Sequence, residues 1–326
     1  MVTQRSARPG RLMGMTTVAF LGPRGTFTEQ AVLDFTTAGH LPADADHVTV
    51  TSPAIALDMV RSGEADVACV ALESSVDGPV TQTFDAFTVG SELQIVREHD
   101  VPVAFQLLVR PGTTLADVRT LTCHPVAYNQ TANWRGVTLP DVTFVAASSN
   151  GAGATAVAAG EVDAALAPAR AGELNGLETL ADGINDLPDA RTRFVLLTRP
   201  QTPPARTGND RTAIVLRVPN EPASLVMALM ELATRRVDMS RIESRPTREK
   251  AGTYNFHVEV AGHIDDPAVA EALAGLYRYA ERFRYLGSWP QEGWVGGVNG
   301  PSGSMPPDYT ESRAWIEART KGEPYA

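Results

Sequence analysis

Short apolar runs alternate with amphipathic stretches over most of the chain, which is the pattern of an α/β fold. Residues 18–21 predict a buried strand, and a glycine-rich turn at residues 22–28 leads into a predicted helix. Ser52 and Pro53 predict the start of a second helix, because serine caps helix N-termini and proline suits the first helical position. We expect that helix to stop at Gly63 and an apolar strand to follow it at residues 66–72.

The same pattern returns at Ser149, 97 positions after Ser52. Gly160-Glu161-x-Asp163 then repeats the earlier Gly63-Glu64-x-Asp66. A repeat this short also arises by chance, but it favours two similar α/β lobes. Ligands of such sheets collect at the carboxyl ends of the strands, so we expect a binding cleft between the lobes.

A proline-rich polar stretch at residues 199–210 predicts a linker between two domains. The order strand, helix, strand, strand, helix, strand after it predicts a ferredoxin-like βαββαβ sandwich. The full division is a flexible extension at 1–15, a catalytic domain at 16–198, the linker, a regulatory domain at 211–290 and a tail at 291–326. We expect the tail to be largely disordered with one short helix, because glycine, proline and serine dominate residues 291–307.

Composition narrows the choice of partner. The chain has 326 residues, 43% of them hydrophobic, and a net charge of −10, which argues against nucleic acid as the ligand. No apolar run approaches the roughly 18 residues needed to span a membrane. Two cysteines indicate no disulfide framework and suit a reducing cytoplasm. The six histidines are scattered without metal-ligand spacing, so no metal site is predicted.

The candidate chemistry lies at the start of a late apolar strand. Thr192 stands between Arg191 and Arg193, just before the run from Phe194 to Leu197. A hydroxyl flanked by two fixed positive charges suits an anionic ligand whose leaving group needs a proton, although a polar strand terminus explains the same residues. Backbone N–H groups of the turn at residues 22–28 offer a second place for an anion, or only a tight turn.

These motifs in series resemble the prephenate dehydratase family with a C-terminal ACT regulatory domain. The resemblance covers residues 18–290, and an intact Thr192-Arg193-Phe194 triplet is among its most specific parts. Its other carriers are Leu21-Gly22-Pro-x-Gly25-Thr-Phe-Thr28, Glu73 through Gly78-x-Val80, His124-Pro125, Asn220-x-Pro222 and Glu243-Ser-Arg-Pro246. It implies a two-lobed α/β catalytic domain of the periplasmic-binding-protein type II kind, joined to a βαββαβ ferredoxin-like ACT domain.

The resemblance implies that prephenate loses CO₂ and water to give phenylpyruvate, without a metal or other cofactor. Thr192 then donates a hydrogen bond to the departing hydroxyl, and Arg193 adds positive charge near the substrate carboxylates. The other catalytic candidates are Glu73, also explained by a structural hydrogen bond, and Ser74. Candidate substrate-binding residues are Thr26, Ser75, Gln130 and Phe194, each with an alternative as a cap, a turn group or core.

Two departures from the family pattern leave alternatives open. Ser74 replaces an expected asparagine, and Ala223 replaces an expected glycine. We therefore keep arogenate dehydration and a catalytically weakened amino-acid sensor as alternatives. The resemblance implies a homodimer or homotetramer that binds L-phenylalanine or another aromatic amino acid. The predicted effector residues are Asn220, Pro222, Ala223, Ser224, Leu225, Glu243, Ser244, Arg245 and Pro246.

Overall fold

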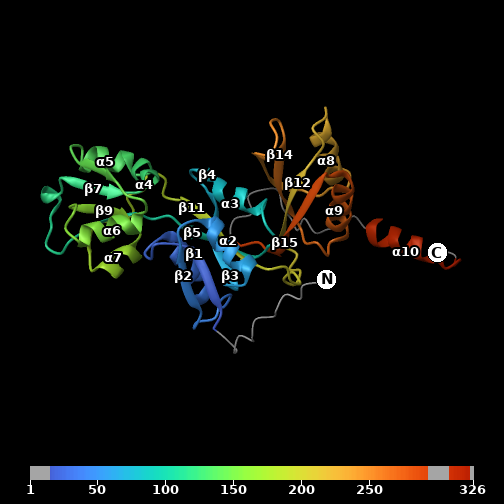
Figure 1. The fold of residues 1–326 in the computed structure, drawn as a ribbon, viewed down its shortest axis with the longest axis horizontal. Coiled ribbons are helices and arrows are strands. Elements are labelled where there is room, and N and C mark those ends of the chain that lie inside the picture. The colour runs from blue at the N-terminus through green and yellow to red at the C-terminus, as the bar shows by residue number, and fades with distance from the viewer. Residues whose placement is uncertain (1–14, 293–307, 324–326) are drawn as a thin grey trace, which may run out of the picture.

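The computed structural model describes residues 15–292 and 308–323. Three sheets lie in a row in Figure 1, with the blue first lobe between the green second lobe and the orange C-terminal domain. The predicted two-lobed fold with a separate βαββαβ domain is confirmed. The predictions of a flexible extension and of a disordered segment fall mostly on residues 1–14 and 293–307, which lie outside the described residues.

The first lobe is a sheet of strand order β2-β1-β3-β11-β5, with helices on both faces. Phe194 and Leu196 of β11 pack on the side of α1, whereas Val195 and Leu197 pack toward α2 and the C-terminal domain. Its strands are β1 (Thr17–Leu21), β2 (Asp46–Val50), β3 (Val67–Ser74), the short β4 (Gly78–Pro79) on β3, β5 (Gln94–Pro102) and β11 (Arg191–Thr198). Its helices are α1 (Phe27–Thr37), α2 (Pro53–Ser62) and α3 (Thr81–Phe87).

The second lobe has the strand order β10-β6-β9-β7-β8. The segment after His124 forms two short helices, because the chain leaves helical geometry at Gln130 and Thr131. The strands are β6 (Gln106–Val109), β7 (Thr120–Cys123), β8 (Thr143–Ala146), β9 (Ala164–Ala167) and β10 (Glu178–Ala181). The helices are η1 (Leu115–Asp117), α4 (Pro125–Asn129), α5 (Ala132–Thr138), α6 (Asn150–Ala158) and α7 (Ala169–Asn175).

The internal repeat corresponds to a structural repeat of the two lobes. Ser52 and Ser149 each accept a backbone hydrogen bond three residues ahead and so cap α2 and α6. Gly63 and Gly160 follow these helices with φ of 81° and 79°, a left-handed conformation that glycine adopts without steric cost. In the first sheet β1 lies between β2 and β3, and in the second sheet β7 lies between β8 and β9. The prediction of two similar lobes is confirmed.

The C-terminal domain has the strand order β13-β14-β12-β15 with α8 and α9 packed on the sheet. It comprises β12 (Asp210–Arg217), α8 (Ser224–Ala233), β13 (Met239–Pro246), β14 (Tyr254–Ala261), α9 (Pro267–Tyr279) and β15 (Arg282–Pro290). The predicted helix of the tail is present as α10 (Asp308–Thr320), which contacts α9. Among the described residues, no helix is long and apolar enough to cross a membrane.

The connection between the domains is held in place by hydrogen bonds. Arg199 donates to the carbonyl oxygens of Val60 and Ala65 at 2.8 and 3.1 Å. The backbone of Gln201 donates to the side chain of Gln94 at 2.9 Å. The beginning of this segment is therefore held against the first lobe.

Ala223 occupies a backbone conformation that favours glycine. Its φ of 65° at the start of α8 lies in the left-handed region, which costs a residue with a Cβ roughly 1–2 kcal/mol. We expect Ala223→Gly to raise the free energy of unfolding by about 0.5–1 kcal/mol, measured by urea titration. The matched control is Ala274→Gly in the middle of α9, which should lower it by about 1 kcal/mol. If both substitutions changed the free energy of unfolding in the same direction, this explanation would be wrong.

His257 of β14 is buried between the C-terminal domain and the first lobe. Its ring lies 5.0 Å from the ring of Phe84, and within the described chain neither ring nitrogen has a hydrogen-bond partner. Burial, reinforced by the nearby Arg241, lowers the pKa of His257 to about 4, although Asp85 and Glu259 partly oppose the shift.

This histidine makes stability depend on pH. Its pKa is lower in the folded chain than in the unfolded chain, so the unfolded state binds the proton first as pH falls. Stability is therefore lost between about pH 6.5 and pH 4, by about 2 kcal/mol at pH 5 relative to pH 7. We expect His257→Met to remove this part of the pH dependence, as measured by urea unfolding at both pH values. If His257→Met left the difference in unfolding free energy between pH 5 and pH 7 unchanged, His257 would protonate freely in the folded chain.

Candidate active site

Thr192 lies at the start of β11, in the middle of the first-lobe sheet. It is paired with Ser74 of β3 on one side and Val101 of β5 on the other. The side chain is half-buried, and its hydroxyl makes no hydrogen bond to any other described residue. Because side chains alternate along a strand, Thr192 shares the α1 side of the sheet with Phe194. Its proton is therefore free for a ligand.

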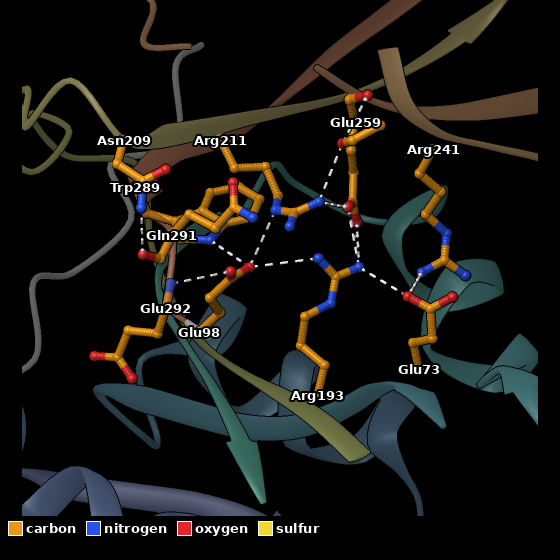
Figure 2. A network of polar contacts seen from close by, with 11 residues as sticks. Glu73, Glu98, Arg193, Asn209, Arg211, Arg241, Glu259, Trp289, Gln291 and Glu292 are labelled. Atoms are coloured by element: carbon orange, nitrogen blue, oxygen red, sulfur yellow. Dashed lines mark hydrogen bonds and ion pairs between the residues drawn. The ribbon is translucent and has the colours of Figure 1, made fainter. Parts of the chain in front are cut away.

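Arg193 points the opposite way, toward the C-terminal domain. Figure 2 shows its guanidinium among three carboxylates. Nη2 lies 2.9 Å from Glu259 and 3.2 Å from Glu73, and Nη1 lies 3.4 Å from Glu98. This is a correction to the predicted contact with substrate carboxylates, because strand alternation places Arg193 and Thr192 on opposite faces of the sheet. Arg193 is 9% exposed, so these ion pairs are buried and are not surface contacts.

The cluster around Arg193 balances three arginines against three glutamates (Figure 2). Arg211 of β12 contacts Glu259 at 2.8 Å and Glu98 at 3.3 Å, and the indole N–H of Trp289 donates to Glu98 at 2.9 Å. Burial by itself lowers the pKa of Arg193, but Glu259, Glu98 and Glu73 together raise it above the ordinary value. Arg193 is therefore a permanent cation in this cluster.

The two buried glutamates respond differently to the cluster. Burial raises the pKa of Glu98 above its ordinary value despite Arg211 and Arg193. Burial acts on Glu259 in the same direction, but Arg193, Arg211 and Arg241 outweigh it and hold the pKa of Glu259 below its ordinary value. Glu259 is thus the ionised partner that compensates Arg193 best.

Glu73 takes part in the same cluster. One of its oxygens accepts from Arg193 at 3.2 Å and from Arg241 of β13 at 2.7 Å. This arrangement agrees with the alternative of a structural hydrogen bond, because the oxygen already accepts from two arginine side chains. The geometry gives Glu73 a bridging contact between the two domains.

Ser74 and Ser75 lie beside Thr192 but use their hydroxyl groups differently. The Ser74 oxygen accepts from the amides of Val76 and Asp77, both at 3.2 Å, and so closes the turn after β3. The Ser74 hydroxyl also lies 3.5 Å from the carboxylate of Asp77, so this catalytic candidate is engaged within its own turn. The Ser75 oxygen accepts from the amide of Arg191 at 3.0 Å and fixes the start of β11.

The glycine-rich turn after β1 lies against the second lobe. A Cβ on Gly25 would come within 3.0 Å of Ala171 in α7, so glycine allows the close approach of the two lobes. The Gly25 amide donates to Glu29 at 2.6 Å, and Thr26 caps α1 by accepting from the amide of Glu29. Thr26 therefore has the cap role that we considered as its alternative, and the Gly25 amide is already bonded within the turn.

A cavity of about 250 Å³ lies where the two lobes meet, beside the start of β11. Gln130 lines it and donates to Asp77 of the first lobe at 2.6 Å, while its own carbonyl oxygen is buried without a described partner. Phe194 does not line the cavity. Its side chain is 2% exposed and belongs to the hydrophobic core, which was the alternative considered for it. The full lining is Val76, Asp77, Asn129, Gln130, Asn185, Asp186, Leu187 and Ala190.

Sequence reasoning missed most of this lining. Asp77 lies two residues after Ser75, within the motif from Glu73 to Val80, and this position was the available signal. Asn185 is tied to the segment between the lobes, where it accepts from the amide of Phe105 at 2.8 Å and donates to the carbonyl of Val103 at 2.7 Å. Neither contact has a local sequence signature, because the partners lie about eighty residues apart.

The predicted effector residues lie at one end of the C-terminal sheet. The loop after β12 and the end of β13 are two strands apart, because β14 lies between them. The separation across that strand is roughly 10 Å. Arg245 of β13 is engaged with Asp85 of α3, through contacts of 3.0 and 3.2 Å. One copy therefore presents the two motifs separately. The loop carries Asn220, Pro222, Ala223, Ser224 and Leu225, and the strand carries Glu243, Ser244, Arg245 and Pro246.

Comparison with known proteins agrees with this architecture. The profile of the prephenate dehydratase family matches residues 18–202. The prephenate dehydratase of Corynebacterium glutamicum is 52% identical over 276 residues, which cover 84% of this chain and 88% of that protein. The structure of Arthrobacter aurescens prephenate dehydratase in complex with L-Phe is 39% identical, with a TM-score of 0.83, and the match covers 94% of this chain and all of that one.

A similar solved structure bears the name of a different activity. GqqA, described as a novel type of quorum quenching acylase, is 32% identical with a TM-score of 0.74, over 85% of this chain and 98% of that one. The family profile covers more than half of the chain, and the Corynebacterium relative spans most of it. The chain therefore belongs to the prephenate dehydratase family.

Proposed function

We propose that this chain converts prephenate into phenylpyruvate, CO₂ and water. The observation that supports this most directly is Thr192, whose hydroxyl is free of other described partners at a central strand end. The bond from the ring to its carboxylate breaks, and the electron pair enters the ring as the C4 hydroxyl leaves. One proton converts the departing hydroxide into water, and aromatisation drives the reaction. These atoms and charges balance without an oxidant or a cofactor.

Within this reaction Thr192 acts as a hydrogen-bond donor. A threonine hydroxyl is too weak an acid to be ionised, so its effect is to stabilise negative charge that develops on the departing oxygen. Ser75 supports this role by bonding to the amide of Arg191, the residue before Thr192. Gln130 of the second lobe donates to Asp77 of the first lobe, so this hydrogen bond joins the two lobes at the cavity.

The decisive test is an assay of the purified protein with prephenate, in which phenylpyruvate is measured by its absorbance in alkali. We expect turnover by the wild type. A folded protein that turns over neither prephenate nor arogenate would favour the sensor alternative, which rests on Ser74 in place of asparagine.

Arogenate is the second candidate substrate. It carries an ammonium group where prephenate has a keto group, and the carboxylates of Asp77 and Asp186 line the same cavity. Both carboxylates already accept protein hydrogen bonds, from Gln130 and from the amide of Asn133. For that reason we place prephenate first. A larger kcat/KM for arogenate in a parallel assay of phenylalanine formation would reverse the order.

We further propose that L-phenylalanine regulates the enzyme through the C-terminal domain in a homodimer or homotetramer. The two effector motifs lie apart within one copy, and β13 is an edge strand of its sheet. A second copy beside β13 would bring a loop motif and a strand motif together. Phenylalanine would then act through its different affinities for two arrangements of the subunits.

A further inference from the structure

The ion-pair cluster of Figure 2 joins the C-terminal domain directly to the strand that carries Thr192. Arg193 is the next residue after Thr192, and its guanidinium is bound most closely by Glu259, which is 4% exposed on β14 of the other domain. Both Glu259 oxygens accept from the same nitrogen of Arg193, at 2.9 and 3.0 Å. The partner of Arg193 that holds it most tightly therefore lies outside the catalytic lobes.

We propose that Glu259, acting through Arg193, is a positioning residue for Thr192. A charge-assisted contact between buried groups is short and directional, so it fixes the backbone of the residue that bears it. A displacement of about 1 Å at a reacting group can cost roughly 100-fold in rate. The C-terminal sheet thus helps to set the geometry of the donor, and this inference rests on the proposed role of Thr192.

The cluster also reaches the strand that carries an effector motif. Arg241 of β13 stands two residues before Glu243 and donates to the same Glu73 oxygen that receives Arg193. A movement of β13 would therefore change the contacts of Glu73 and, through them, those of Arg193. This places the positioning contact on a continuous path between the effector strand and β11.

The main test compares two contacts between the same domains. Glu259→Gln keeps the shape of the side chain but removes the charge that holds Arg193. The control is Arg284→Met on β15, because Arg284 also joins the domains, by donating to the carbonyl oxygens of Phe87, Val89 and Gly90. Arg284 does not touch β11 or the cluster, so it reports the effect of a weakened domain interface alone.

Hydrogen–deuterium exchange gives a readout that does not require turnover. We expect Glu259→Gln to speed exchange in the peptide at residues 191–196 by about tenfold or more, and Arg284→Met to leave that peptide unchanged. In the prephenate assay, Glu259→Gln should lower kcat by about 10- to 100-fold with KM within about threefold. The control should keep kcat within about twofold.

The outcomes separate the two proposals. Unchanged exchange at residues 191–196 in Glu259→Gln, or an equal loss of kcat in both variants, overturns the positioning role. Wild-type protein without turnover overturns the proposed function, while the exchange data still decide whether Glu259 holds β11. If Glu259→Gln does not fold, Glu259→Asp retains the charge on a shorter arm. That variant should show the same changes, by about tenfold in kcat.

Discussion

Replacing Thr192 by valine should lower kcat for prephenate by about 100- to 10,000-fold. Valine keeps the shape and the strand preference of threonine and removes only the hydroxyl. The hydroxyl has no other partner among the described residues, so its loss should leave the fold unchanged. Because the hydrogen bond strengthens as charge develops on the departing oxygen, the loss should appear in kcat more than in KM. Steady-state kinetics on both proteins measure it.

The other end of the same strand offers a matched control. Thr198 also carries a half-buried hydroxyl on β11, and it donates to the carbonyl of Arg199, away from the cavity. Thr198→Val should keep kcat within about twofold. If Thr192→Val retains near wild-type turnover, or if both valine variants lose activity alike, Thr192 has no special part in the reaction.

Replacing Arg193 by methionine should lower the free energy of unfolding by about 3–5 kcal/mol. Methionine fills most of the volume but leaves Glu98 and Glu259 buried with one cation fewer. Removing one partner of a buried ion pair is costly because the remaining charge is neither solvated nor compensated. Urea unfolding gives the difference directly. An arginine that only bound substrate would instead raise KM and leave unfolding nearly unchanged.

A surface ion pair provides the comparison for this loss. Arg170 lies 2.9 Å from Glu173 on α7, and its side chain is 34% exposed. Arg170→Met should cost at most about 1 kcal/mol, because solvent screens exposed charges. A similar small cost for Arg193→Met would mean that water reaches the cluster and that Arg193 is not a structural cation.

Local sequence signals were enough for much of the fold. Ser52 and Ser149 cap their helices as expected, since a serine hydroxyl reaches its own helix start whatever packs around it. The order of helices and strands along the C-terminal domain also followed from apolar patterning. Patterning did not separate α4 from α5, and short strands such as β8 and β10 gave no clear signal. A strand of four residues is specified mainly by its neighbours in the sheet.

In the candidate site, too, some features follow from the local sequence and others follow only from tertiary packing. The sequence by itself determined that Thr192 begins a buried strand and that two capped lobes and a βαββαβ domain follow one another. Only the tertiary structure decided where Arg193 and Glu73 point. Their partners lie 66 to 168 residues away along the chain. Strand alternation sends neighbouring side chains to opposite faces of a sheet, and which face meets a carboxylate is set by packing between domains, which no local pattern encodes.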